Sequence, residues 1–97
     1  MLIGGENVHP SEVEDVLRHH PQVLDVAVVP RPDADFGQRA VAHVVVAEPM
    51  AHPEALLAWA AERMAPAQRP VAVVVHDALP RNAAGKVMRS ALVEGQG

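Results

Sequence analysis

"QVLDVAVVPRPDADFGQRAVAHVVVAE", residues 22–48, contains two runs of β-branched and small apolar residues separated by a polar stretch. Runs of this length and composition are typical of buried β-strands, so we expect strands over 22–30 and 40–48. The link at 31–39 contains Pro, Asp and Gly and predicts a long loop. Because this link is too short for a helical crossover, the two strands are expected to pair antiparallel.

Helical patterns flank this pair of strands. Ser11 is expected to begin the first helix with Glu14 as its capping-box partner, and His19, His20 and Pro21 end it. Downstream, the periodicity predicts a helix over 53–65 that Pro66 ends, a strand over 71–76 and a short helix over 87–95. The third strand can join the same sheet through the helical crossover. The order αββαβα therefore predicts one α+β domain over 1–97 with a small three-stranded sheet.

Composition excludes several functional classes. The net charge is −4 and no basic stripe with interleaved aromatics is present, which argues against a nucleic-acid partner. The chain has no cysteine, so disulfides, thiolate metal ligands and thiol nucleophiles are excluded. Because we find no signal-peptide core and no membrane-spanning segment, we expect a cytoplasmic protein without a membrane partner.

Three familiar kinds of site are also absent from the sequence pattern. The six histidines form no His-x-x-x-His pair and lack acidic residues at ligand spacing, so we expect no metal site. The segment "AAGKV" resembles a phosphate loop, but Pro80 and Val87 stand where that loop requires Gly and Ser or Thr. No Ser-His-Asp order or nucleophile elbow can be assigned, which argues against a self-contained hydrolase.

Two loop motifs remain, and their local pattern leaves their roles open. "IGGEN" begins a predicted loop over 4–10 and equally fits a flexible hairpin end. Lys86, in "RNAAGKVMR", is the only lysine among the eight basic residues. An exposed lysine beside a helix cap is its ordinary alternative, because lysine is rarely buried.

Read together with the segments between them, these motifs resemble a known family. "GGENVHPSEVEDVL" and "LPRNAAGKVMRSAL" are similar, in order and spacing, to the small C-terminal domain of the adenylate-forming enzymes. That superfamily includes acyl-CoA synthetases, the adenylation domains of nonribosomal peptide synthetases and firefly luciferase. The Gly-Gly-Glu-Asn version resembles the acyl-CoA synthetase branch.

The resemblance implies a role in ATP-dependent ligation of a carboxylic acid to a thiol. In such enzymes a large N-terminal domain binds ATP and the acid, and the C-terminal domain closes over it as a lid in two orientations. Lys86 would serve acyl-adenylate formation, with Arg81 and Gly85 as supporting loop residues. The thiol tunnel would be formed with the loop of Gly4, Gly5, Glu6 and Asn7. The resemblance implies ATP and either CoA or phosphopantetheine as ligands, with Mg bound mainly by the N-terminal domain. It implies the N-terminal adenylation domain or subunit and an acyl carrier protein as partners.

The chemistry explains why a lysine suits this position. Attack of a carboxylate on phosphorus brings two anions together, and a compact ammonium can contact oxygens of both. With a pKa near ~10.4 in water, the amine acts as a protonated charge rather than a base. Arginine is planar and bulkier and is not equivalent, while Gly85 lets the backbone turn sharply and approach the ligand.

The sequence also departs from the family pattern. The three residues given before the glycine pair, Met1–Ile3, do not include the hinge residue expected from the family and make this stretch slightly short, while His9 and Gln68 stand where aromatic residues are common. The chain fits either a fragment or a free-standing lid acting in trans; Met1 without a visible tag favours the latter. In isolation it is expected to be inactive. The alternative is a non-catalytic α+β regulatory or protein-interaction module, which would tolerate loss of Lys86.

Overall fold

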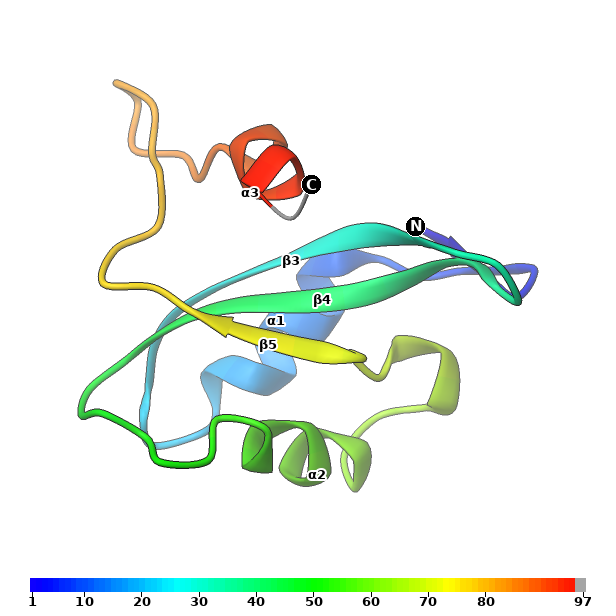
Figure 1. Cartoon of the computed structure of the whole chain (residues 1–97), viewed down its shortest axis with the longest axis horizontal. Helices are drawn as coiled ribbons and strands as arrows, with labels where there is room; N and C mark the ends of the chain where they lie inside the picture. The colour runs from blue at the N-terminus through cyan, green and yellow to red at the C-terminus, as the bar shows by residue number, and fades with distance from the viewer. Residues whose placement is uncertain (96–97) are drawn as a thin grey trace.

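A three-stranded sheet lies at the centre of the computed structural model, which describes residues 1–95 (Figure 1). Its strands lie in the order β3 (Val23–Asp33), β4 (Gly37–Val46) and β5 (Ala72–Val75). β3 and β4 are antiparallel, as expected from their short connection, whereas β5 runs parallel to β4. This parallel pairing confirms that the chain returns to the same sheet through a helical crossover.

Helices and short elements complete the domain. The helices are α1 (Pro10–Arg18), α2 (Ala55–Ala61) and α3 (Arg89–Gly95); a 3-10 turn, η1, covers Pro66–Gln68, and β1 (Leu2–Ile3) pairs with β2 (Glu6–Asn7). The predicted α+β class and the order αββαβα are confirmed. None of the helices within residues 1–95 has the length and apolarity needed to cross a membrane.

Both faces of the sheet are covered, and alternating residues of β3 and β4 divide the core in two. Val26, Val28 and Val44 face α1 and α2, where they pack with Leu17 and Leu56. The intervening residues face α3 and the preceding loop, in a second cluster of Ala27, Val29, Val41, Leu79 and Leu92. α3 accordingly lies across the sheet from α1 and α2 (Figure 1). Burial on both faces explains the continuous apolar runs in the sequence.

The β3–β4 hairpin is longer than predicted. The expected loop over 31–39 is wrong at both ends, because β3 continues to Asp33 and β4 begins at Gly37. Pro30 and Pro32 suggested a loop, but β3 is an edge strand of this sheet, where proline is tolerated. Asp33 closes the turn by accepting the N–H groups of Asp35 and Phe36, both at 2.9 Å. These two bonds lower the pKa of Asp33 below its usual value.

The predicted helix boundaries need two corrections. α1 begins at Pro10 rather than Ser11, and its N-cap residue, His9, makes no side-chain cap. The capping-box role of Glu14 is therefore wrong, since this side chain is buried. α2 is shorter than the predicted 53–65, because its last turn tightens where the Arg63 N–H donates to the Ala60 carbonyl. Its expected apolar face is nevertheless buried at Leu56, Ala60 and Met64 and half-buried at Leu57 and Ala61.

Candidate functional site

Lys86 lies on a small hairpin over residues 80–88, called here the lysine hairpin. Arg81 and Val87 form an antiparallel bridge, and the Met88 N–H donates to the Pro80 carbonyl at 2.8 Å. The Asn82 side-chain oxygen accepts the N–H groups of Ala84 (2.9 Å) and Lys86 (3.0 Å). Gly85, at φ +85°, adopts a backbone conformation that other residues rarely occupy. The hairpin is thus ordered internally, while the Lys86 side chain is exposed to solvent.

Two arginines attach the lysine hairpin to the rest of the domain. Arg81 pairs with Asp25 of β3 and also donates to the Gly85 carbonyl at 2.7 Å. Arg89, directly after the hairpin, donates to both carboxylate oxygens of Glu14 of α1 at 2.7 and 2.8 Å. Residues far apart in the sequence therefore fix the loop that presents Lys86.

Glu14 is the buried member of this arrangement. Its side chain is 4% exposed, and it also accepts the backbone N–H of Val28 at 2.8 Å. Sequence reasoning missed this role, although the helical spacing of Val13, Glu14 and Leu17 places all three on one face. Asp25 was also missed, because a single acidic residue in a strand carries no distinguishing signal.

A charged hollow of ≈ 330 Å³ lies beside Lys86. Its polar lining consists of Glu14, Arg18, Asp25, Arg81, Lys86 and Arg89. The carboxylates there are already paired with arginines, whereas no hydrogen bond or ion pair is recorded for the Lys86 ammonium among the described residues. The lysine is therefore available to an anion from outside the domain.

The glycine pair forms a turn rather than an unstructured loop. β1 and β2 pair through Ile3 and Glu6, with Gly4 (φ +56°) and Gly5 (φ +85°) between them, as a type I′ hairpin turn requires. The predicted loop over 4–10 is thus wrong at Glu6–Asn7, which form β2. The Gly4 N–H donates to the Phe36 carbonyl at 2.9 Å, and a Cβ on Gly4 would lie 3.1 Å from the Phe36 ring. Both positions have a positive φ that favours glycine, and a Cβ at Gly4 would also crowd the half-exposed Phe36 ring.

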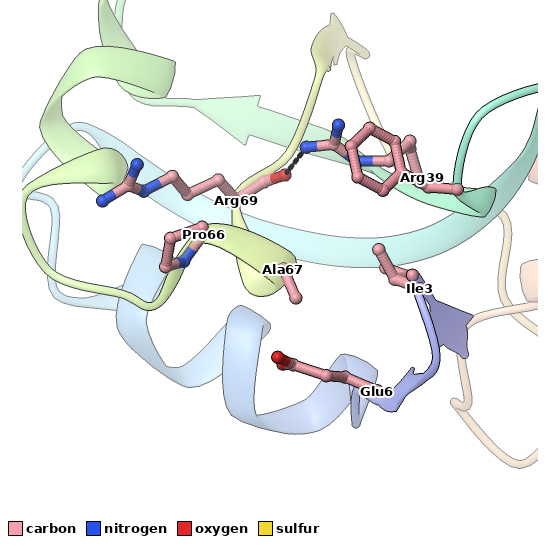
Figure 2. A pocket seen from close by; sticks show the side chains of 8 residues that line it. Ile3, Glu6, Arg39, Pro66, Ala67 and Arg69 are labelled. Atoms are coloured by element: carbon pink, nitrogen blue, oxygen red, sulfur yellow. Dashed lines mark hydrogen bonds between the residues drawn. The ribbon is translucent and has the colours of Figure 1, made fainter.

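A second hollow, of ≈ 360 Å³, lies beside this glycine turn (Figure 2). Arg39 of β4 stacks its guanidinium 4.7 Å from the centre of the Phe36 ring and donates to the Arg69 carbonyl at 3.5 Å. The Arg39 Nε is buried and has no hydrogen-bond partner among residues 1–95. Glu6 of β2 and Ala67 of η1 complete the polar and apolar sides of this hollow. Sequence reasoning found Glu6 but missed both arginines.

The two loops lie at opposite ends of β3. Asp25, near its beginning, pairs with the lysine hairpin, and Phe36, just beyond its end, bonds the glycine turn. An extended strand from Asp25 to Asp33 spans roughly 25 Å. The predicted site residues therefore form two groups, with Arg81, Gly85 and Lys86 in one and Gly4, Gly5, Glu6 and Asn7 in the other.

This pair of motifs on this fold matches a known domain. The family model of the AMP-binding enzyme C-terminal domain covers residues 12–86. The chain belongs to this family. Its relatives include the 4-chlorobenzoate–CoA ligase of Arthrobacter sp, which is 42% identical over 91 residues covering 94% of this chain and 17% of that protein. The long-chain-fatty-acid–CoA ligase FadD13 of Mycobacterium tuberculosis (strain ATCC 25618 / H37Rv) is 35% identical over 94 residues, or 97% of this chain and 19% of that protein.

Solved structures show the same domain. The o-succinylbenzoate CoA synthetase (MenE) of Bacillus subtilis, in complex with its acyl-adenylate intermediate, superposes with a TM-score of 0.85 at 38% identity, over 94% of this chain and 19% of that one. The AMP-binding enzyme C-terminal domain is therefore one part of each of these longer ligases, and this chain spans less than a fifth of their length.

Within residues 1–95, no group of three or more His, Cys, Asp or Glu residues could hold a metal ion.

Two histidines of the domain lie together, with Nδ1 of His43 2.7 Å from Nε2 of His76. His43 is buried, and this burial, followed by the nearby His76, lowers the pKa of His43. The side chain of Gln68 caps η1 and donates to Glu12 of α1 at 3.4 Å.

Proposed function

We propose that this chain, over 1–97, is the C-terminal lid of an acyl-CoA synthetase-like ligase that acts with an N-terminal adenylation domain in cis or in trans. The observation that carries the proposal is the placement of two distinct polar loops at opposite ends of β3. One end offers an exposed ammonium to an anion, and the other offers a side-chain-free turn. Each suits one half of an adenylation and thioesterification reaction, and the CoA ligases among its relatives support this assignment.

In the first half-reaction, the carboxylate of the acid attacks the α-phosphorus of ATP, the new acyl–phosphate bond forms and pyrophosphate leaves. The Lys86 ammonium would contact the carboxylate and an α-phosphate oxygen, offsetting repulsion and stabilising charge as it develops. Any Mg that accompanies ATP would be bound by the N-terminal domain.

In the second half-reaction, a thiol attacks the acyl carbonyl carbon and AMP leaves. The glycine turn would border the channel that the pantetheine arm occupies, because Gly5 has no atom within 4 Å of where a Cβ would stand. We propose CoA as the acceptor rather than a carrier protein. The CoA ligases among the relatives support this choice. Arg39 and Arg69, beside this turn, supply cationic groups that suit the phosphate that CoA and a carrier-protein arm both bear.

The test replaces Lys86 with alanine in this domain, fused to or mixed with its N-terminal partner. Loss of one preorganised charge contact typically reduces a rate about 10²–10³-fold. We therefore expect ATP–pyrophosphate exchange, which reports adenylation, to collapse by that factor. Thioester formation from a supplied acyl-adenylate should persist.

Lys86→Arg serves as the matched control, because it keeps the charge but changes its shape. It should restore little exchange activity. Unchanged exchange in Lys86→Ala would contradict the catalytic role and favour the alternative, a non-catalytic interaction module.

A further inference from the structure

Arg81 connects the lysine hairpin to β3 through a single planar group. One guanidinium nitrogen, Nη2, pairs with Asp25 Oδ2, and the other, Nη1, donates to the Gly85 carbonyl at 2.7 Å. The peptide that directly precedes Lys86 is thus linked to the central sheet. We propose that Asp25 and Arg81 are positioning residues for Lys86, an inference that rests on the proposed adenylation role of this lysine.

The Asp25–Arg81 pair is poorly suited to stabilise the fold. The Arg81 side chain is 43% exposed and the Asp25 side chain 27%, and exposed ion pairs of this kind contribute little to stability. Other contacts attach the hairpin to the core, since Leu79 is buried before it and Val87 packs against the second apolar cluster. Removing the pair should therefore leave the fold intact.

What the pair can determine is the direction of the hairpin. The hydrogen bonds of Asn82 hold residues 82–86 in a fixed shape, but they lie within the hairpin and do not orient it relative to β3. Arg81 contacts both β3, through Asp25, and the tip of the lysine hairpin, through the Gly85 carbonyl. Because the lysine side chain is long, a tilt of this backbone displaces the ammonium more than it displaces the backbone itself, and fewer side-chain conformers then contact the reacting oxygens.

The test compares Asp25→Asn with Glu62→Gln in the ligase formed with the N-terminal partner. Glu62 also pairs with an arginine, Arg63 at 3.6 Å, but it lies at the end of α2 and outside the charged hollow that contains Lys86. Misplacement of a reacting group by about 1 Å can cost about 10²-fold in rate. We expect Asp25→Asn to lower kcat of pyrophosphate exchange about tenfold to a hundredfold. KM for ATP and thioester formation from supplied acyl-adenylate should be unchanged.

Further measurements distinguish positioning from a structural role. In the 97-residue chain, ¹⁵N relaxation should show larger amide motion at Gly85 and Lys86 in Asp25→Asn, with an unchanged melting temperature. Arg81→Lys should behave similarly, because an ammonium lacks the planar fork that reaches both partners. In a Lys86→Ala background, Asp25→Asn should cause no additional loss of exchange.

Failure of the positioning role and failure of the proposed function give different results. If Lys86→Ala abolishes exchange but Asp25→Asn exchanges normally, the positioning role is overturned while the lysine's role stands. A parallel loss of both half-reactions with a lowered melting temperature would also overturn it, in favour of a structural pair. Normal exchange in Lys86→Ala would instead overturn the proposed function itself.

Discussion

At the scale of single residues, the buried carboxylate of Glu14 joins three elements that are distant in sequence. It accepts the Val28 N–H of β3 and both hydrogen bonds from Arg89 of α3, while its own backbone belongs to α1. Removing Glu14 and removing Arg89 should have different effects, because the Glu14 side chain is 4% exposed and the Arg89 side chain is 48% exposed. Arg89 can return to water, whereas Glu14 cannot.

This asymmetry makes a prediction about stability. Arg89→Met keeps an apolar stem but leaves a buried charge without its main partner, which should lower the free energy of unfolding by about 3 kcal/mol. Glu14→Gln keeps an acceptor for the Val28 N–H and should cost about 1 kcal/mol. Urea denaturation of the two single variants and the double variant measures both effects. The Arg89→Met cost should largely vanish in the Glu14→Gln background, and simple additivity would contradict this explanation.

Candidate residues could be singled out from the sequence where a motif contains them, but not where only a tertiary contact involves them. Lys86 and Gly85 could be singled out because one is the sole lysine and the other permits the turn observed at φ +85°. Glu14 matched a capping box in sequence, but the structure uses it as a buried acceptor. Its partner Arg89 is 75 residues away, so no local pattern could have revealed the pair.

At the scale of elements, two substitutions in the glycine turn distinguish the effect of backbone conformation from the effect of side-chain size. Both Gly5→Ala and Gly5→Leu force a side chain onto a backbone at φ +85°, which costs about 1–2 kcal/mol in either variant. Only leucine adds bulk to the proposed channel. We therefore expect Gly5→Leu to reduce thioester formation from supplied acyl-adenylate much more than Gly5→Ala does, with adenylation retained in both. Equal effects of the two variants, in melting temperature and both half-reactions, would indicate a folding defect alone.

Elements were predictable in type and order, but their ends were not. The apolar runs in 22–30 and 40–48 correspond to the centres of β3 and β4. The ends depend on cross-strand pairing, such as Arg31 with Arg39, which the residue types near the turn do not indicate. For β1 and β2, each of two residues, the hydrogen bond from Gly4 to Phe36 supplies a tertiary contact that no sequence period encodes.

At the scale of the whole molecule, His43 makes stability depend on pH. Burial and the neighbouring His76 lower the pKa of His43 below the 6.5 expected in the unfolded chain. Below pH 6.5 the unfolded state therefore binds a proton more readily than the folded state, and the free energy of unfolding decreases as pH falls toward the lower folded pKa. Above pH 6.5 His43 is neutral in both states, so this loss of stability is absent there.

The measurement is the melting temperature of the 97-residue chain between about pH 7.5 and about pH 5. We expect the melting temperature to decrease below pH 6.5, and His43→Gln to flatten that decrease. His9→Gln, at an exposed histidine whose side chain makes no hydrogen bond or ion pair within residues 1–95, should leave the profile unchanged. An identical slope in His43→Gln would contradict the assignment.

The long β3–β4 hairpin has a mechanical consequence. It is the most extensive pairing in the sheet and is buried on both faces, so it should behave as a stiff beam with one polar loop fastened near each end. If the domain turns about an axis that crosses the middle of the hairpin at a large angle to its length, the two ends move in opposite directions. Retracting one loop would then advance the other by geometry alone, without a relay of side-chain rearrangements. On the proposed function, the order of the two half-reactions would then follow from the rotation of the domain.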